Sequence, residues 1–429
     1  MYAKEYPEAE VPRDDPAAEP GRPAEARPPA RPDRLPLIPR YEDQGYAPEL
    51  VARRRAWIEE RTGCRLEHAG SFSIPSEGMR GNVENPIGAA QTPLGVAGPL
   101  ELRGEHAQGT FFVPLATTEG ALVRSYERGM VAITRAGGAA ARVVLDANRV
   151  CPLFAFEGVA EAAAFAAALP GLLGEVRAEA EATTRHGRLL ELIPRQVGRD
   201  VVVEFRYSTG DAHGMNMITR ATDRACRWLA RRTAARSFTL MSGAEGEKHA
   251  AGSLLAGGKG KTAVAGVRLP RRVVRSVLAT TPEALAELWR RTVVGHLTSG
   301  ALGYNGHAAN GLTALFIACG QDVANAVNSA TAITTLEVED GDLHAAVTLP
   351  SLTVATVGGG TGQGTARECL EMLGCAGDGG APKLAEIAAA TVLAGELSFG
   401  AALAAGGFVE AHETYGRNRP NPQGPGEGE

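Results

Sequence analysis

The feature that most restricts the fold is an ordered series of strand and helix patterns between residues 140 and 242. Segments rich in β-branched and aromatic residues predict strands at 150–157, 188–197, 201–208 and 237–241. Helical patterns fall at 159–185, with Pro170 at an expected restart, and at 218–233. This β-α-β-β-α-β order is typical of the split βαβ unit, an antiparallel sheet with helices on one face. We therefore predict a small ferredoxin-like domain at 150–242.

The segment Asp211–Met217 reads DAHGMNM and stands where the last long strand of this unit passes into a helix. Such a junction offers free backbone N–H groups to an anion. Its spacing is not the GxGxxG of doubly wound dinucleotide-binding domains, so any nucleotide here must be held by another architecture. By residue type alone, Met215 and Met217 could equally serve core packing.

The segments on either side, 84–139 and 250–412, share small residues, helical patterns typical of buried helices, and polar residues between those patterns. We therefore interpret the small domain as an insertion into a larger, mainly helical one. The fold class predicted is α+β. The Gly-rich stretch around Lys248 is expected to be a mobile loop lining a cleft between the domains. The predicted divisions are a disordered Pro-rich arm at 1–40, a helical segment at 41–83, the large substrate domain at 84–149 and 250–415, the small domain at 150–242, the lysine loop at 243–249 and a flexible tail at 416–429.

Composition narrows the class of protein. A chain of 429 residues with 44% hydrophobic content can bury two or more cores, and a net charge of −5 gives no electrostatic case for nucleic acid. Six scattered cysteines without CxxC pairs indicate neither a disulfide framework nor a zinc site, and they favour the cytoplasm. The most apolar stretch, 390–409, is interrupted by Glu396 and by glycines. We expect no membrane insertion, no secretion and no metal.

Four titratable residues stand in apolar or Gly-rich settings: Glu119, Lys248, Asp322 and His412. Reduction of an acyl thioester needs a cation for the oxyanion, an acid for the carbonyl oxygen and a second acid for the departing thiolate. The nucleophile is a hydride, so no activated Ser or Cys is required. Taken singly, Glu119 could cap a helix and His412 could be a charge at a helix end.

Three further motifs accompany these residues: ENPIGAAQTPLGVAGPL at 84–100, GYNGHAAN at 303–310 and VGGGTGQGT at 357–365. With DAHGMNM, they closely resemble hydroxymethylglutaryl-CoA reductases, in the right order over roughly residues 80–415. The resemblance implies a two-step reduction in which two NADPH carry hydroxymethylglutaryl-CoA through a mevaldyl-CoA hemithioacetal and mevaldehyde to mevalonate and free CoA. It also implies a homodimer or tetramer with the active site between subunits.

Roles for single residues follow from the same resemblance. Glu119 matches the proton donor toward the carbonyl oxygen and Lys248 the lysine that stabilises the oxyanion. Asp322 matches the aspartate that tunes both, and His412 the histidine that protonates the CoA thiolate. The matches to NADPH contacts are Thr184, Arg185, Asp211, Met215, Asn216, Met217, Gly358, Gly359 and Gly360. The matches to contacts with the acyl group and CoA are Arg149, Ser242, His249, Asn310, Ser125, Arg128 and Arg290.

Two positions depart from the family pattern. The loop that normally reads Asp-Lys-Lys-Pro reads Glu247-Lys248-His249-Ala250, so a shorter and only partly charged histidine replaces a lysine expected at the substrate's terminal carboxylate. Glu127 replaces an asparagine near CoA and would repel its phosphates unless Arg124 or Arg128 pairs with it. Two alternatives therefore remain: a paralogue that reduces a related acyl thioester, and a catalytically silent homologue.

Overall fold

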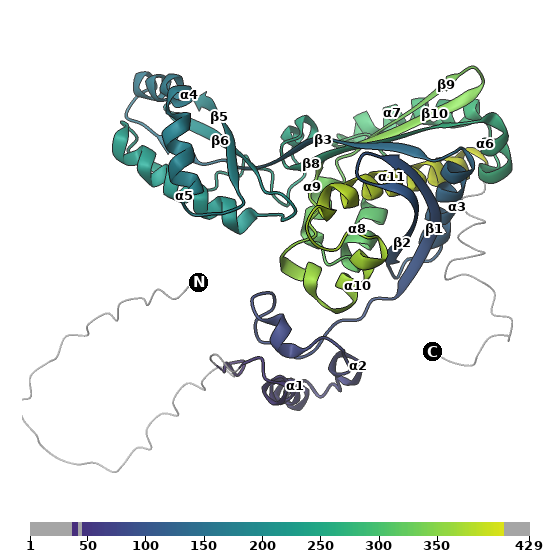
Figure 1. Ribbon diagram of the computed structural model, residues 1–429, viewed down its shortest axis with the longest axis horizontal. Coiled ribbons are helices and arrows are strands. Elements are labelled where there is room, and N and C mark those ends of the chain that lie inside the picture. The colour runs from purple at the N-terminus through teal and green to yellow at the C-terminus, as the bar shows by residue number, and fades with distance from the viewer. Residues whose placement is uncertain (1–36, 42–44, 407–429) are drawn as a thin grey trace, which may run out of the picture.

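The computed structural model describes residues 37–41 and 45–406, which form a mixed helix-and-sheet fold (Figure 1). Most of the expected Pro-rich arm, the expected tail at 416–429 and His412 lie outside the described residues. The helical segment expected at 41–83 contains α1, Pro48–Thr62. This helix is followed by the short α2, Glu67–Gly70, and by η1, Ser76–Met79.

The larger part of the chain is built on a sheet whose strands follow the order β2-β1-β3-β8-β10-β9. All neighbours are antiparallel except β1 and β3. The strands are β1 Leu94–Gly104, β2 Gln108–Ala116, β3 Ala139–Val150, β8 Gly260–Leu269, β9 Ile333–Glu339 and β10 Asp342–Leu352.

This sheet corrects the expectation of a mainly helical large domain. Three of its strands, β1, β3 and β8, are rich in Ala and Gly, which carry little strand propensity, so their composition suggested helices. What decides the conformation is burial with a period of two, seen most clearly along β8, where inward and half-exposed positions alternate. Alanines of that strand such as Ala263 and Ala265 are fully buried.

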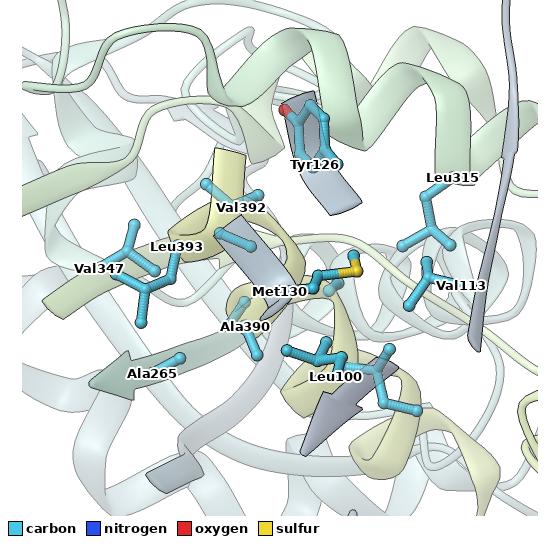
Figure 2. Packing of buried hydrophobic residues seen from close by; sticks show 14 of the residues in the cluster. Leu100, Val113, Tyr126, Met130, Ala265, Leu315, Val347, Ala390, Val392 and Leu393 are labelled. Carbon is cyan, nitrogen blue, oxygen red and sulfur yellow. The ribbon is translucent and has the colours of Figure 1, made fainter. Parts of the chain in front are cut away.

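Helices cover this sheet, and one of them, α11, runs through the hydrophobic core of the larger part. They are α3 Leu122–Arg135, α6 Arg271–Leu278, α7 Pro282–Ser299, α8 Ala308–Ala318, α9 Ala326–Ser329, α10 Gly364–Met372 and α11 Gly380–Ala404, with the 3-10 turns η2 Gly252–Ala256, η3 Val323–Asn325 and η4 Gly359–Gly362. Figure 2 shows Val392 and Leu393 of α11 among side chains from the sheet and from α3 and α8, including Leu100, Met130 and Leu315.

By length and composition alone, two helices of the described chain, α11 and α4 (Val159–Glu181), could cross a membrane. In α11, 78% of the most apolar window is buried inside the fold. Two buried glutamates on α11 accept hydrogen bonds from loop backbone: Glu386 from residues 105–107, and Glu396 from residues 306 and 307. The apolar character of α11 therefore serves the protein core.

The smaller part has the expected element order: β4 Leu153–Ala155, α4, β5 Arg188–Val197, β6 Asp200–Ser208, α5 Met215–Arg232 and β7 Ser237–Thr239. Its strands pair antiparallel in the order β7-β4-β6-β5, and the end of β3 also pairs with β6. Its buried residues, all between 150 and 238, form a cluster separate from that of the larger sheet.

Two local predictions in this part were wrong. The expected restart at Pro170 does not occur, because α4 runs through it and buries Phe165 and Leu169 on one side of the proline and Val176 on the other. Packing on both sides outweighs the one hydrogen bond that proline removes. The strand expected at 150–157 is interrupted at Cys151 and Pro152, so β3 ends and β4 begins there.

Candidate active site

Lys248 and Asp322 form an ion pair between two loops that are 74 positions apart in the sequence. Lys248 Nζ lies 2.8 Å from Asp322 Oδ2, and both side chains are about half exposed. Asp322 is held by its own turn, because its carboxylate accepts a hydrogen bond from Ala324 N at the start of η3. The bond to Asp322 raises the pKa of Lys248. The amine is therefore a cation that remains open to a ligand.

Glu247, next to Lys248, points inward and binds the fully buried Lys259. His213 of the DAHGMNM motif lies on its other side, with Nε2 3.7 Å from Glu247 Oε1. Burial opposes ionisation of Glu247, but His213 and Lys259 outweigh it and lower the pKa of Glu247 to about 2. Sequence reasoning missed this network; the signal was a lysine between glycines in GKGK, ahead of β8.

Ligand atoms of His213, Glu247 and Asp322 lie within 4.8 Å of one another, a spacing that could hold a metal ion. Two ammonium groups already neutralise the two carboxylates, Lys248 at Asp322 and Lys259 at Glu247. A divalent cation would have to displace both or overcome their repulsion. The charge balance therefore favours the two lysine ammonium groups over a metal ion at these carboxylates.

Asp211 joins the DAHGMNM motif to the large part. Its carboxylate accepts hydrogen bonds from Gly379 N at 2.7 Å and Ala381 N at 3.0 Å, which caps the N-terminus of α11. Its carbonyl accepts from Thr356 N, and Ala212 forms a parallel bridge with Val357. The carboxylate of Asp211 is thus committed to the fold. The two motifs matched to NADPH, 146 residues apart, lie side by side.

The Gly-rich turn at 358–360 also lies against the segment that carries Asp322. A Cβ on Gly320, whose φ is +63°, would stand 2.6 Å from Gly360 O. Only glycine permits this approach, which places the turn against Gly320, two positions before Asp322 in the chain. Asp322, Lys248, the turn and the DAHGMNM motif therefore form one site.

In the small part, the predicted NADPH contacts surround the start of α5. That helix begins at Met215 with Gly214 as its N-cap. The backbone N–H groups of its first turn, Met215 to Met217, therefore have no partner within the helix. Met217 packs beside Gly187 and Thr184, whose hydroxyl accepts from the backbone of residues 186 and 187. Arg185 and Asn216 are exposed.

Glu119 belongs to a second cluster. Asn310 Nδ2 donates to Glu119 Oε1 at 3.2 Å, and the two line a cavity of about 100 Å³ with Ser125, Tyr126 and His307. Tyr126 is fully buried and its hydroxyl lies 3.1 Å from His307 Nδ1. This tyrosine–histidine pair, which sequence reasoning did not single out, forms the floor of the cavity.

The two clusters lie at opposite ends of α8. Asn310 is in its first turn, and Asp322 follows its last. A helix of 11 residues is about 16 Å long. No hydrogen bond or ion pair among the described residues joins Glu119 to Lys248 or Asp322. One chain therefore pairs Lys248 with Asp322 and places Glu119 with Asn310, a predicted substrate contact, in a separate cluster.

Three predicted substrate contacts lie beside or within the lysine loop. Arg149 is buried, and its guanidinium donates to Glu245 O, Gly257 O and Ser253 Oγ, so it holds the loop from beneath. Ser242 donates its hydroxyl to Cys151 O at 2.6 Å. His249 is exposed, and its Nδ1 lies 2.5 Å from Glu247 O.

The residues matched to CoA lie on two helices. Ser125 and Arg128 of α3 bind Ser398 of α11, and burial lowers the pKa of Arg128. Arg290 lies on the exposed face of α7 and pairs with Glu287 at 2.8 Å. Glu127 is paired with Arg124 at 2.6 Å, which removes much of the repulsion that its charge would exert on phosphates.

Comparison with known proteins gives one consistent result. The profile of the family described as hydroxymethylglutaryl-coenzyme A reductase matches residues 50–417. A 3-hydroxy-3-methylglutaryl-coenzyme A reductase of Methanothermobacter thermautotrophicus is 46% identical over 382 residues, covering 88% of this chain and 96% of the relative. Its counterpart in Methanocaldococcus jannaschii is 44% identical, covering 85% and 92%.

Solved structures show the same fold at lower identity. The 3-hydroxy-3-methylglutaryl-coenzyme A reductase of Streptococcus pneumoniae superposes with a TM-score of 0.63 at 19% identity, covering 82% of this chain and 96% of that one. A class II enzyme from the same organism, bound to NADPH in open conformations, also gives 0.63, at 20% identity and with 84% and 98% covered.

Proposed function

The chain belongs to the hydroxymethylglutaryl-coenzyme A reductase family, a family of oxidoreductases, and we propose that it reduces (S)-3-hydroxy-3-methylglutaryl-CoA to (R)-mevalonate and free CoA. The reaction consumes two NADPH and two protons and releases two NADP⁺. The mevalonate pathway of isoprenoid precursor synthesis would use the product. All six cysteines are free thiols, which suits a cytoplasmic location.

The observation that carries this proposal is the exposed Lys248–Asp322 pair beside the DAHGMNM motif and the Gly-rich turn. A thioester carbonyl gains negative charge on oxygen as hydride arrives, and an ammonium held nearby stabilises that charge. A lysine is already protonated at neutral pH, and Asp322 raises the pKa of Lys248 further. Glu119 would supply the proton to the carbonyl oxygen, and His412, outside the described residues, the proton to the CoA thiolate.

The residues around α5 suit NADPH. The unpaired backbone N–H groups at Met215–Met217 can bind phosphate oxygens, and the exposed Arg185 offers a guanidinium for a 2′-phosphate. When bound, NADPH supplies the hydride equivalents for both reduction steps. The protein contributes the binding surface. The bridge between Ala212 of the DAHGMNM motif and Val357 beside the Gly-rich turn would hold that surface in a fixed position relative to Lys248.

We further propose a homodimer, or a tetramer of such dimers, with each active site shared by two subunits. The separation of the Glu119 and Lys248 clusters by α8 supports this arrangement, because both are needed at one carbonyl. Val294 and Leu297 of α7 are 70% and 77% exposed, as expected of side chains that a second copy would cover.

The test is an assay of NADPH oxidation with hydroxymethylglutaryl-CoA and titration of the released thiol. We expect two NADPH consumed and one thiol formed per thioester. Lys248→Ala should lower kcat on the order of 10²–10³-fold with little change in NADPH affinity. A wild-type protein that binds NADPH but never reduces the thioester would refute the proposal in favour of a silent homologue.

A second candidate, reduction of a related acyl thioester, rests on His249. Its ring is turned toward the Glu247 carbonyl, and it replaces a lysine expected at the substrate's terminal carboxylate. A panel of acyl-CoA substrates with and without that carboxylate separates the two candidates. A higher kcat/KM for a thioester that lacks the carboxylate would favour the second.

A further inference from the structure

Lys259 is a fully buried lysine to which none of the roles above assigns a function. Glycines flank it, with φ of +80° at Gly258 and +89° at Gly260. A Cβ on Gly260 would stand 2.4 Å from Leu352 O, so the backbone here is pressed against the end of β10. The position of Lys259 is therefore set by the large sheet.

The ammonium of Lys259 binds three segments at once. Its partners are the carboxylate of Glu247 in the lysine loop, Asn148 Oδ1 on β3 at 3.0 Å, and Met215 Sδ in the DAHGMNM motif at 3.1 Å. An ammonium has three donors, so these contacts exhaust it. Asn148 extends the link, because its Nδ2 donates to His213 O at 2.9 Å.

The contact with Glu247 bears directly on Lys248. Lys248 has a φ of +56°, in the left-handed region that costs a non-glycine residue about 1 kcal/mol or more. Such a conformation persists only where its surroundings impose it. Glu247 is anchored inward at Lys259, and the amine of Lys248 is held outward at Asp322. The two ion pairs thus fix the residue from both sides.

Stability alone does not account for a lysine at this place. Burial lowers the pKa of Lys259, and the charge of Glu247 counteracts it. A buried ion pair commonly stabilises a fold no better than apolar residues of similar volume. The pair is better explained by what it holds in place.

We infer that Lys259 is a positioning residue for the reduction: through Glu247 it holds Lys248 in its left-handed conformation, and through Asn148 and Met215 it keeps the lysine loop in register with the DAHGMNM motif. The inference rests on the proposed function for its catalytic consequence. Its structural part, that Lys259 orders the loop, stands apart from any activity.

The experiment compares the full-length wild type with Lys259→Met, the double variant Glu247→Gln/Lys259→Met, and Lys261→Met as a matched control. Lys261, two residues further on at the start of β8, is also buried and is paired with Asp146 at 2.7 Å. Among the described residues, none of its hydrogen bonds or ion pairs reaches the lysine loop. The measurements are kcat, KM for the thioester, the Kd of NADPH by fluorescence, the urea midpoint of unfolding, and hydrogen–deuterium exchange at residues 245–250.

Lys259→Met should lower kcat about 100-fold, the usual cost of a small misplacement of a catalytic group, with less than about threefold change in KM and Kd. Exchange at 245–250 should rise, while Lys261→Met leaves that exchange at the wild-type rate. The double variant leaves neither charge buried alone, so its urea midpoint should recover while kcat stays low.

Recovery of kcat together with the midpoint in the double variant would reduce Lys259 to a structural role and overturn the inference. Unchanged exchange at 245–250 in both variants would also overturn it. If the wild type fails to reduce the thioester, the proposed function is refuted, and the exchange measurement still decides whether Lys259 orders the loop.

Discussion

At the scale of single residues, the site depends on how each charge is held. Lys248 faces solvent and Asp322, whereas its neighbours point away from it: Glu247 inward to Lys259, and His249 back to the loop backbone. One three-residue segment thus presents a cation, an anchor and an exposed imidazole in three directions. The left-handed backbone at Lys248 contributes to this, because it lies within a tight turn in which His249 N donates to Gly246 O.

We predict that His249→Lys strengthens substrate binding. A lysine is longer than histidine and carries a full charge, so it should reach the terminal carboxylate of hydroxymethylglutaryl-CoA. It should then lower KM about tenfold or more, as expected for one hydrogen bond between charged groups. Steady-state kinetics measure this, with kcat expected to stay within about twofold. His106→Lys, the same change on the exposed β1–β2 turn, serves as the control. An unchanged KM would mean that position 249 does not meet the carboxylate.

We predict a pH-dependent contribution of Glu247 to stability. Folding lowers its pKa from 4.5 to about 2, so the folded state favours the ionised form, by on the order of 3 kcal/mol at most. That contribution is complete above about pH 5 and is lost as the pH falls from 4.5 toward 2. Urea denaturation should show a stability difference between wild type and Glu247→Gln that shrinks as the pH falls from 4.5 toward 2. A difference independent of pH down to pH 3.5 would contradict it.

At the scale of elements, close helix packing sets where the Glu119 cluster stands. The helix α3 carries Ser125, Tyr126 and Arg128, and it approaches α11 so closely that a Cβ on Gly129 would lie 1.9 Å from Ala394 O. Tyr126 likewise lies where side chains at Gly311 and Gly395 would be. Glycines on two helices, α8 and α11, thus allow one tyrosine of α3 to pack beside the cavity.

We predict opposite effects for two glycine-to-alanine changes in helices. Gly129→Ala should destabilise the protein by about 3 kcal/mol or more, because the methyl group overlaps backbone that cannot move freely. Gly171→Ala on α4 meets nothing within 4 Å and should stabilise by roughly 0.5–1 kcal/mol through helix propensity. Urea unfolding measures both. Equal effects at the two positions would show that the α3–α11 approach is looser than described.

At the scale of the whole molecule, the proposed dimer is the arrangement that would bring together the two ion-pair and hydrogen-bond clusters at the ends of α8. The DAHGMNM motif is attached to the large part through Asp211, so the small part, the lysine loop and Asp322 form one half of the proposed site. Glu119 and Asn310 form the other half. A two-fold dimer places the same two halves opposite each other twice.

We predict that two inactive variants complement each other. Glu119→Gln and Lys248→Ala should each be nearly inactive as homodimers. After mixing under conditions that exchange subunits, each heterodimer keeps one site with both native residues, so activity should recover to about a quarter of wild type for random pairing. No recovery, with heterodimers verified by native mass spectrometry, would place both residues in a site within one chain.

Local patterns in the sequence determined much of this protein. Alternating β-branched residues predicted the small unit's strands, and motifs such as DAHGMNM and EKHA marked the residues that the structure gathers around Lys248. These signals are legible because helix and strand periods, turns and motif spacing act over a few residues.

Only the tertiary structure decided the rest. The Ala- and Gly-rich strands of the large sheet have the composition of helices, and only the alternating burial seen in the fold identifies them as strands. Pro170 lies within α4 because packing on both sides of it holds the helix together. The capping of α11 by Asp211, the burial of Lys259 and the distance between Glu119 and Lys248 are relations between segments far apart in the chain. Such relations depend on how complete elements pack, which no local pattern records.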